Sequence, residues 1–324
     1  MLTIRELQNI VSRNISNIDF DKEPLGLYEP ISYTMKTGGK RIRPALCLAG
    51  CNIFSDDVTP AYPIASAFEI FHNFTLLHDD IMDNSPIRRN KETVHIKWNS
   101  NTAILSGDAM MIKSYELLSD LSPELLKVIL PLFNKTALQV CEGQQYDMDF
   151  ENKDDVSEAE YLNMIKLKTS VLIAASLKAG AVCGGASEYD ADLLYEFGLN
   201  TGLAFQLKDD LLDVYGNTAL FGKKTGNDII TGKKTFLLIN ALQISDNKTY
   251  MILKDTVKSN EIRNEDKIKI VTQIYDKLQI KELTLNKIKE FHIKALQSLK
   301  AVSVDEARKS ELYEFVSKLE EREK

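Results

Sequence analysis

Apolar residues recur at three- and four-residue intervals along almost the whole chain, and this spacing constrains the fold more than any other feature. Between residues 61 and 83, such intervals link Ile64, Phe68, Phe71, Thr75, Leu76 and Asp79, which predicts an α-helix. Alternating polar and apolar runs, which would indicate strands, are essentially absent. Glycine (15) and proline (8) are scarce among the 324 residues, which disfavours a loop-rich or all-β fold. The sequence therefore predicts an all-α protein.

Further helices are predicted from start signals and apolar spacing, and they begin at or near Ser122, Ser157, Asp190 and Ser303. Ser157 and Glu160 form a capping-box pair, so a helix should run from there to about Cys183. A second such pair, Ser303 with Glu306, predicts the start of a final charged helix. None of the breaks between these segments has the composition of an interdomain linker. We therefore expect a single domain spanning residues 1–324.

The balance of charged residues argues against nucleic acid as a partner of this protein. The 40 basic and 47 acidic residues give a net charge of −7, so no general nucleic-acid footprint is present. A phosphate-rich ligand would need a local basic site. The first twenty residues carry charges at apolar positions, unlike a signal peptide, and no uncharged run is long enough for a membrane span. We expect a cytoplasmic protein with no membrane span and no nucleic-acid partner.

An acidic cluster follows the first long apolar run, in "LLHDDIMDNSP" at residues 76–86. Asp79 and Asp83 are four residues apart and would share one side of a helix, with Asp80 able to make a supporting contact. The C-terminal end of a helix is its negative pole, so stability alone would not select carboxylates there. A solvated helix end is one explanation. The other is a hard cation such as Mg²⁺, which usually binds through one or two carboxylates plus substrate phosphates.

A second copy of the motif favours the metal explanation. "FQLKDDLLDVYG" (205–216) repeats the spacing with Asp209, Asp210 and Asp213. Basic residues follow both motifs, namely Arg88 and Arg89 after the first, and Lys223, Lys224 and Lys233 after the second. Carboxylates, Mg²⁺, phosphate and Arg or Lys form a self-consistent set of charges. The pair of motifs therefore predicts a Mg²⁺-diphosphate site.

The segment "GGKRIRP" (38–44) is a third element. It is not a Walker A loop, because Lys40 is followed by arginine and the upstream glycine is missing. Lys40, Arg41 and Arg43 would instead form a compact cationic site where a flexible turn meets a helix. An exposed basic turn is the alternative.

These segments together resemble the trans-isoprenyl diphosphate synthases, the all-α prenyltransferases that elongate allylic diphosphates with isopentenyl diphosphate. The resemblance is clearest from about residue 30 to 240 and fades in the C-terminal third. It implies one large helical bundle of the isoprenoid synthase type with a central active-site cavity, Mg²⁺ as the cofactor and a homodimer. The stretches that carry it are "GGKRIRP", "FEIFHNFTLLHDDIMDNSPIRR", "SGDAMM", "GQQYD", "KLKTSVL", "FQLKDDLLD", "GKKTGNDI" and "GKKT".

The resemblance also implies roles for individual residues. The Mg²⁺ ligands would be Asp79, Asp83 and Asp209, supported by Asp80, Asp210 and Asp213. The allylic diphosphate would be held by Arg88, Lys168, Lys223 and Lys233. Isopentenyl diphosphate would be bound by Lys40, Arg43, His72 and Arg89. The residues near the cationic carbon would be Thr169 and Gln206, which present oxygen dipoles.

The chemistry of such an enzyme agrees with these residues. Ionising the allylic C–O bond requires the charge of the leaving diphosphate to be neutralised, and the allylic cation must be kept from water. The double bond of isopentenyl diphosphate then attacks, and the family view assigns the final proton to the departing diphosphate. His78, beside Asp79, is interpreted as a helix-packing residue rather than as a base. Asn90 stands where many family members carry glycine.

Product length in this family depends on bulky residues one turn before the first Asp-rich motif. Phe74 lies five residues before Asp79, and the smaller Thr75 lies four before it, a combination that resembles the geranylgeranyl type. A farnesyl diphosphate synthase is the alternative, followed by longer-chain enzymes. Phe74 would otherwise be an ordinary core aromatic, with the depth of the cavity set by Met110, Met111 or Tyr115.

Two other kinds of protein could carry such motifs, a class I terpene cyclase and a regulatory subunit without catalysis. Class I terpene cyclases share the first Asp-rich motif, but "NDIITGKKT" (227–235) has Thr235 where their second metal motif carries glutamate. A cyclase also needs no isopentenyl diphosphate site. A regulatory subunit without catalysis would not need to keep every carboxylate intact. The sequence therefore predicts a Mg²⁺-dependent short-chain prenyltransferase.

Overall fold

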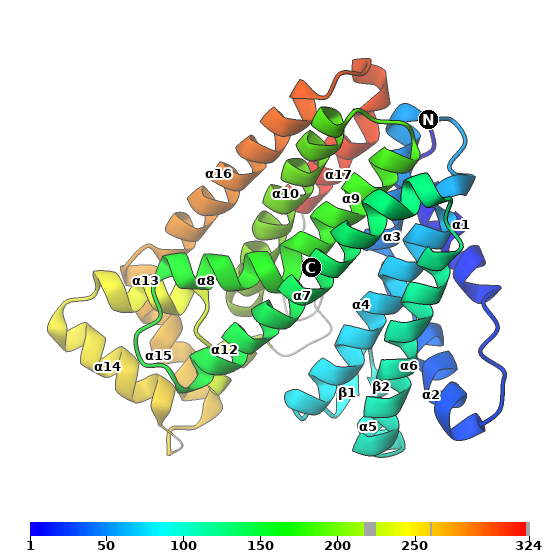
Figure 1. Ribbon diagram of the computed structural model, residues 1–324. Helices are drawn as coiled ribbons and strands as arrows, with labels where there is room; N and C mark the ends of the chain where they lie inside the picture. The colour runs from blue at the N-terminus through cyan, green and yellow to red at the C-terminus, as the bar shows by residue number, and fades with distance from the viewer. Residues whose placement is uncertain (217–224, 260, 322–324) are drawn as a thin grey trace. The chain divides into compact units, whose positions relative to one another are not determined.

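The computed structural model describes residues 1–216, 225–259 and 261–321, which are mostly helical (Figure 1). Within these ranges the only strands are two residues long and form one antiparallel hairpin. The predicted all-α class is confirmed. The chain divides into two compact units, formed by residues 1–134, 175–195 and 302–312 (unit 1) and by residues 135–174, 196–301 and 313–324 (unit 2). The single domain expected for residues 1–324 stays a prediction.

Unit 1 contains the N-terminal helices and the hairpin. Its elements are α1 (Ile4–Ser16), α2 (Leu25–Lys36), α3 (Ile42–Phe54), η1 (Thr59–Ala61), α4 (Tyr62–Met82), β1 (Ile87–Arg88), β2 (Lys91–Glu92), α5 (Val94–Lys97), α6 (Ser100–Ser119) and η3 (Glu306–Arg308). Helix α4 lies at its centre, with α6 running beside it in Figure 1 and with α1, α2, α3 and α5 also in contact. Residues 64–71 of α4 are all buried, so this helix is held on all sides.

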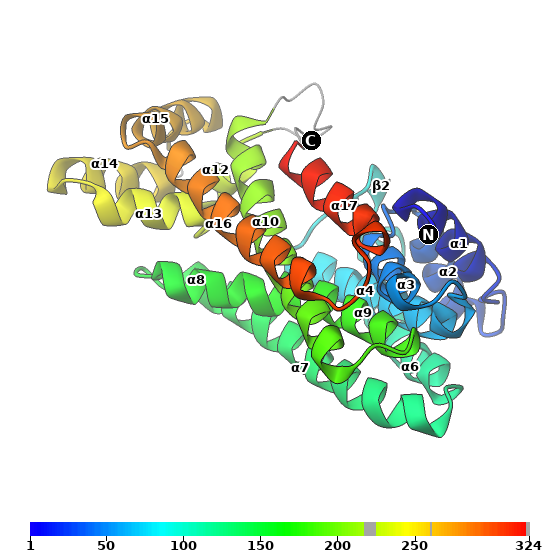
Figure 2. The same ribbon diagram turned by 90° about the horizontal axis from the view of Figure 1, so that it is seen from above.

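Unit 2 contains α8 (Glu158–Ile165), the π-helical turn η2 (Lys166–Ser170), α12 (Asn227–Thr231), α13 (Phe236–Ile244), α14 (Asn247–Lys258), α15 (Asn264–Lys277) and α16 (Ile280–Ala301). Helices α13 to α16 are neighbours at one side of Figure 2. Their core includes Phe236, Tyr275 and Phe291, which pack with Tyr161 of α8. Four helices have residues in both units: α7 (Pro123–Asn152), α9 (Val171–Cys183), α10 (Glu188–Tyr215) and α17 (Ser310–Glu320).

Three glycines allow α3 and the unit 1 part of α9 to approach each other at backbone distance. A Cβ atom on Gly180 would lie 1.8 Å from the carbonyl oxygen of Cys47, and one on Gly50 would lie 2.3 Å from that of Leu177. One on Gly184 would lie 2.5 Å from the Cys51 carbonyl oxygen. Glycine is therefore required along this contact for steric reasons.

Most helix starts agree with the sequence signals. Helix α4 covers residues 62–82, α7 begins at Pro123, and both hydrogen bonds of the Ser157–Glu160 capping box are present. The predicted start at Ser303 is wrong, because the last helix begins at Ser310. The Ser303 amide instead donates to Oδ1 of Asp190 at 2.8 Å, and Glu306 pairs with Lys309. Tertiary partners therefore replace the expected reciprocal cap.

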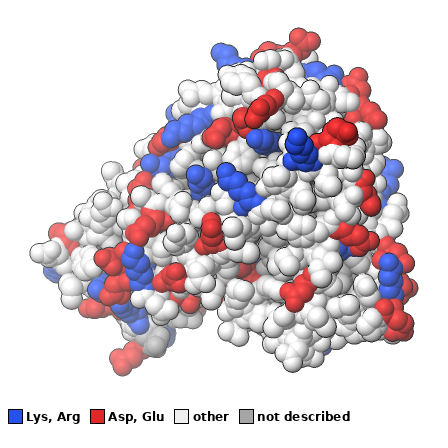
Figure 3. All heavy atoms as spheres, viewed as in Figure 1, with Lys and Arg blue, Asp and Glu red and all other residues white. Residues whose placement is uncertain are grey.

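The surface offers neither a bilayer-crossing helix nor a large patch of one charge on the face drawn. Among the described residues, no helix is both long and apolar enough to pass through a membrane. On the face shown in Figure 3, acidic and basic side chains are interspersed, with uncharged residues between them.

The α3–α9 contact makes a stability prediction. Gly180→Ala should lower the free energy of unfolding by about 1–3 kcal/mol, because the added methyl group forces two backbones apart. Thermal unfolding followed by circular dichroism measures this change. Gly26→Ala is the matched control, since a Cβ at that helical position meets nothing within 4 Å and should be neutral or slightly stabilising. Equal melting temperatures for the two variants would contradict the prediction.

Candidate active site

The first Asp-rich motif closes α4, as the sequence predicted. Asp79 lies in the last turn and Asp83 is the C-cap, whose amide donates to the Asp79 carbonyl at 2.8 Å. Asp79 is half-buried and Asp83 is exposed. The two carboxylates are one turn apart at the negative end of a helix. Such a position is unfavourable for anions unless a cation binds there.

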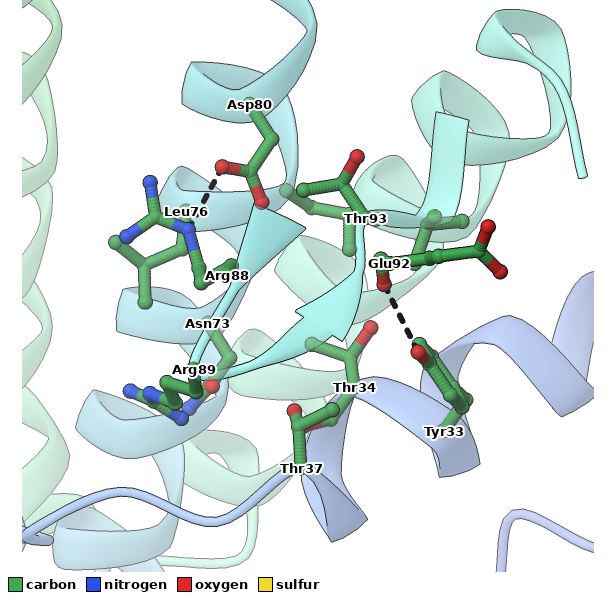
Figure 4. Close-up of a pocket in the computed structure, with 12 residues that line it drawn as sticks. Tyr33, Thr34, Thr37, Asn73, Leu76, Asp80, Arg88, Arg89, Glu92 and Thr93 are labelled. Atoms are coloured by element: carbon green, nitrogen blue, oxygen red, sulfur yellow. Dashed lines mark hydrogen bonds and ion pairs between the residues drawn. The ribbon is translucent and has the colours of Figure 1, made fainter. Parts of the chain in front are cut away.

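Asp80 has a different environment from its two neighbours. It is 5% exposed, and its Oδ1 accepts a hydrogen bond from Nε of Arg88 at 2.7 Å (Figure 4). Burial raises the pKa of Asp80, while the Arg88 guanidinium opposes that shift. Asp80 was expected to support the metal ligands. In the structure its carboxylate orients Arg88.

The hairpin β1–β2 presents the two arginines that follow the motif. Its turn residues, Arg89 and Asn90, have positive φ angles of 53° and 62°, as a type I′ hairpin turn requires. Asparagine tolerates this left-handed conformation better than most residues, so Asn90 suits its place in the turn. The Thr93 hydroxyl donates to the Ser85 carbonyl at 2.7 Å and closes the base of the hairpin.

The basic turn between α2 and α3 meets α4 and the hairpin. Nη1 of Arg43 lies 3.1 Å from Nε2 of His72 on α4, and Arg89 donates to the Gly38 carbonyl. Gly39 has a φ of 141°, and a Cβ there would lie 2.8 Å from the Arg89 guanidinium. The structure thus brings Arg43, His72 and Arg89 to one turn, which also carries the exposed Lys40.

His72 is neutral in this cationic environment. Burial, together with the nearby charges of Arg43 and Arg89, holds the pKa of His72 well below its ordinary value. A neutral imidazole accepts one hydrogen bond, so Nε2 is the acceptor for the Arg43 guanidinium. His72 therefore orients Arg43 without adding a charge of its own.

A small cavity adjoins these groups in unit 1, with a volume of about 30 Å³. Figure 4 shows that Asn73, Asp80, Arg88 and Arg89 are among the residues that line it. This volume is about the size of one water molecule. It is therefore a polar gap within the cluster, and the central cavity implied by the resemblance remains a prediction.

The second Asp-rich motif lies on α10 in unit 2. Asp209 and Asp213 are half-buried and one turn apart, whereas Asp210 is buried. Tyr161 donates its hydroxyl to Oδ2 of Asp210, and Nε2 of Gln206 donates to Oδ1 at 3.1 Å. Burial, with Asp228 nearby, raises the pKa of Asp210 to about 7. Both oxygens of Asp210 thus have protein partners.

Thr169 and Gln206 lie together, as expected of residues that act at one place. The Thr169 hydroxyl donates to Oε1 of Gln206 at 3.2 Å, so the hydroxyl, the amide and the Asp210 carboxylate form a continuous chain of hydrogen bonds. Thr169 stands in η2, where the helix widens to a π turn. Such turns are often found at functional sites.

Two of the expected lysines share one carboxylate that the sequence reasoning did not single out. Nζ of Lys168 lies 2.6 Å from Oδ2 of Asp147, and Nζ of Lys233 lies 3.9 Å from the same oxygen. Burial would raise the pKa of Asp147, but the two lysines outweigh it and the pKa is lowered. The sequence did contain a signal for Asp147, because this residue ends "GQQYD", one of the stretches that carry the family resemblance. Gly143 in the same motif lets α7 approach η2, because a Cβ there would lie 2.3 Å from the Lys168 amide.

The remaining residues of the second motif region are placed as follows. Oδ2 of Asp213 accepts the Asp228 amide at 3.0 Å, so Asp213 also fixes the first turn of α12. Tyr161 and Asp228 were both missed as neighbours of the motif. Asp228 stands in the stretch "GKKTGNDI", but nothing in the local sequence points to Tyr161. Lys223, predicted to hold the allylic diphosphate, lies outside the described residues, as does Lys224.

The donor set fits Mg²⁺ in chemistry. Carboxylate oxygens are the hard donors that Mg²⁺ prefers, so the predicted ligands Asp79 and Asp83 of unit 1 and Asp209 of unit 2 each suit that ion. Within the ranges that the structure describes, no three His, Cys, Asp or Glu side chains are grouped as ligands of one ion.

The expected chain-length residues lie on the part of α4 that precedes the motif. Phe74 is 8% exposed, and its ring centroid is 5.5 Å from that of Phe71 and 4.8 Å from that of His78. The Thr75 hydroxyl donates to the His72 carbonyl at 2.8 Å. His78 packs against α6, with Nε2 3.1 Å from the Ile104 carbonyl oxygen, as expected of a helix-packing residue.

Comparisons with known proteins agree with this arrangement of residues. The family model described as polyprenyl synthetase matches residues 25–275. The chain belongs to the polyprenyl synthetase family. The trans-isoprenyl diphosphate synthase resemblance and the prenyltransferase class predicted from the sequence are thereby confirmed.

Individual members of the polyprenyl synthetase family are similar over most of their length. A geranylgeranyl diphosphate synthase of Methanosarcina mazei is 43% identical over 68% of each chain, and one of Saccharolobus solfataricus is 38% identical over 82% of this chain and 81% of its own. The crystal structure of a geranylgeranyl pyrophosphate synthase superposes with a TM-score of 0.94 at 41% identity, covering 100% of both chains. A polyprenyl synthase of Caulobacter crescentus, complexed with calcium and isoprenyl diphosphate, gives a TM-score of 0.86 at 27% identity over 99% of this chain and 98% of its own.

The first motif gives a direct test of catalysis by this polyprenyl synthetase. Asp79→Ala should lower kcat by about 10²-fold or more, because a diphosphate leaving group then loses part of its charge compensation. Steady-state elongation assays measure the rate, and circular dichroism checks the helical content. Asp120→Ala is the matched control, since Asp120 is an exposed acidic C-cap of α6. A near-normal rate for Asp79→Ala would rule out its assigned role.

Proposed function

We propose that the protein is a Mg²⁺-dependent geranylgeranyl diphosphate synthase, which condenses isopentenyl diphosphate with an allylic diphosphate. Asp79, Asp83 and Asp209 serve as Mg²⁺ ligands in this proposal. Arg88, Lys168 and Lys233 hold the allylic diphosphate. Lys40, Arg43, His72 and Arg89 bind isopentenyl diphosphate. When bound, Mg²⁺ would neutralise charge on the diphosphate as it leaves.

The observation that carries the proposal is that unit 1 has two adjoining polar clusters, which share the lining of one small cavity. One consists of the Asp-rich motif with Arg88, and the other of the basic turn with Arg43, His72 and Arg89. A terpene cyclase handles one diphosphate and has no need of the second cluster. Two diphosphate sites are what a condensation of two diphosphates requires. The names of the similar relatives support the geranylgeranyl product.

The chain's own residues account for each step of such a condensation. Asp80 keeps the Arg88 guanidinium in place to receive charge from the breaking C–O bond. The Thr169 hydroxyl and the Gln206 amide present oxygen dipoles to the allylic cation, and Asp210 and Tyr161 hold Gln206 in position. His72 is neutral, and it orients Arg43 toward the second diphosphate without taking a proton.

Product analysis tests the proposal. Wild-type protein is incubated with isopentenyl diphosphate, Mg²⁺ and either dimethylallyl, geranyl or farnesyl diphosphate, and products are separated by chain length. We expect geranylgeranyl diphosphate to accumulate with each primer. Accumulation of farnesyl diphosphate would favour the farnesyl synthase alternative, and no elongation with any primer would refute the enzyme assignment.

Phe74 is proposed to stop chain growth. Phe74→Ala removes a ring that packs on Phe71 and His78, and the freed volume should allow products longer than those of the wild type. The same chain-length separation measures the shift. Phe291→Leu is a control for loosening an aromatic core, because Phe291 is similarly buried, at 7% exposed, and belongs to the core of unit 2. An unchanged product distribution in active Phe74→Ala would exclude Phe74 as the stop.

We also propose that the protein is a cytoplasmic homodimer. Helix α6 supports the dimer, because Leu105 and Ile112 are 60% and 64% exposed and lie two turns apart with Ile104 beside them. Exposed apolar residues on one side of a helix are typical of an interface. Light scattering after gel filtration should give a dimer for the wild type and a monomer for Leu105→Glu/Ile112→Glu. A double variant that remains dimeric would place the interface elsewhere.

A further inference from the structure

Glu69 is a buried carboxylate on α4 that the function described so far does not use. It is 2% exposed and lies two residues before Phe71, among apolar side chains. A buried carboxylate is costly unless it is paired and hydrogen-bonded. Oε1 of Glu69 accepts from Nη1 of Arg41 and from Nδ2 of Asn73, the latter at 3.0 Å. Its partner Arg41 belongs to the basic turn, 28 residues earlier in the chain.

Arg41 has an unusual backbone conformation. Its φ of 48° and ψ of 38° are left-handed, at the N-cap of α3, a region that residues other than glycine rarely adopt. Such a conformation persists only where the surroundings hold it. Here the side chain is 9% exposed, and its guanidinium donates to Glu69 and to the Met35 carbonyl at 2.6 Å. Glu69 and the end of α2 therefore hold Arg41 in place.

The left-handed residue sits between the two cations assigned to isopentenyl diphosphate. Lys40 precedes it and Arg43 follows two residues later. Arg43 is bound by His72, one helical turn beyond Glu69 on α4. The basic turn is thus attached to successive turns of the same helix, by Arg41 at Glu69 and by Arg43 at His72. Arg89 holds the start of the turn through Gly38.

The contact between Arg41 and Glu69 gives Arg41 a different role from the other cations of the basic turn. The sequence grouped Lys40, Arg41 and Arg43 as one cationic site, but Arg41 is neutralised by Glu69 and faces the protein interior. The Glu69 carboxylate also favours the charged form of Arg89, opposing the burial that lowers the Arg89 pKa. Arg41 is therefore structural, whereas Lys40, Arg43 and Arg89 are the cations that the proposed function assigns to isopentenyl diphosphate.

We propose that Glu69 is a positioning residue for the second diphosphate. By fixing Arg41 in its left-handed conformation, it sets the directions in which Lys40 and Arg43 leave the turn, and so determines affinity for isopentenyl diphosphate but not for the allylic substrate. This inference rests on the proposed function. Asn73 assists by donating to Glu69, both at its side chain and at its backbone carbonyl, the latter at 2.8 Å.

The test is a comparison of Michaelis constants. Glu69→Gln should raise KM for isopentenyl diphosphate about tenfold, while KM for the allylic substrate stays within about twofold and kcat falls less than KM rises. Arg41→Gln should have the same signature. The double variant should be no worse than the worse single one, since the two residues act as a pair.

Asp190→Asn is the matched control. Asp190 is a buried carboxylate of the same unit that accepts from Ser303 and Ser187, away from the basic turn. The same change from carboxylate to amide should lower its melting temperature and leave both Michaelis constants near wild-type values. If Glu69→Gln fails to fold, Arg41→Gln carries the same measurement.

Three results would overturn the inference: an unchanged KM for isopentenyl diphosphate, an equal rise for both substrates, or multiplying effects in the double variant. Wild-type turnover in the same assay separates this failure from that of the proposed function. Calorimetric titration of isopentenyl diphosphate into wild type and Glu69→Gln makes the comparison without turnover. Equal affinities there would also count against a positioning role.

Discussion

Compensation of buried charge is the constraint on which the rest of this structure depends. The polar residues of the site stand on helices whose other faces are packed into apolar cores, so their carboxylates cannot be solvated freely. Three of them are matched locally by cations: Asp80 by Arg88, Glu69 by Arg41, and Asp147 by Lys168 and Lys233. These contacts hold long, flexible cations in fixed directions before any substrate arrives, which is the main requirement for electrostatic catalysis.

The same compensation distinguishes the buried middle carboxylate of each Asp-rich motif from its more exposed neighbours. Asp79 and Asp83 stand at the end of α4, where solvent is accessible, while Asp80 between them points inward to an arginine. On α10, the two carboxylate oxygens of Asp210 accept hydrogen bonds from Tyr161 and Gln206. Asp209 and Asp213 on either side are less buried. In each motif the middle carboxylate anchors protein groups. The outer carboxylates of each motif are more exposed than the middle one.

Much of the fold was predictable because its signals are local. The apolar period of α4, the proline at the start of α7 and the Ser157 capping box all act within a few residues. The Asp-rich motifs and the basic turn could be found for the same reason, and two motifs at equal spacing made the diphosphate chemistry specific. Signals of this kind can be recognised in the sequence without knowledge of the tertiary structure.

The features that the sequence did not predict depend on contacts between residues far apart in the chain. Ser303 looks like a cap, yet its amide binds Asp190, which is 113 residues away in the chain. Glu69 reads as one polar residue in an apolar run, because its partner lies 28 residues earlier, and Tyr161 meets Asp210 across 49 residues. Asp147 stood in a recognised motif, but only the fold shows that two lysines converge on it. Pairings of this range are set by packing, which single-sequence patterns do not encode.

The π turn at Lys166–Ser170 has a consequence for how this region can change. A π turn contains one residue more than the α-helical turn it replaces, and each residue of an α-helix advances the direction of side chains by about 100°. Lys168 and Thr169 reach Asp147 and Gln206 only in this register. A single-residue deletion in the turn would make a more regular helix and would rotate the following residues away from their partners. A change of length in this segment would therefore disturb both contacts at once, whereas a substitution at Lys168 or Thr169 would remove only one of them.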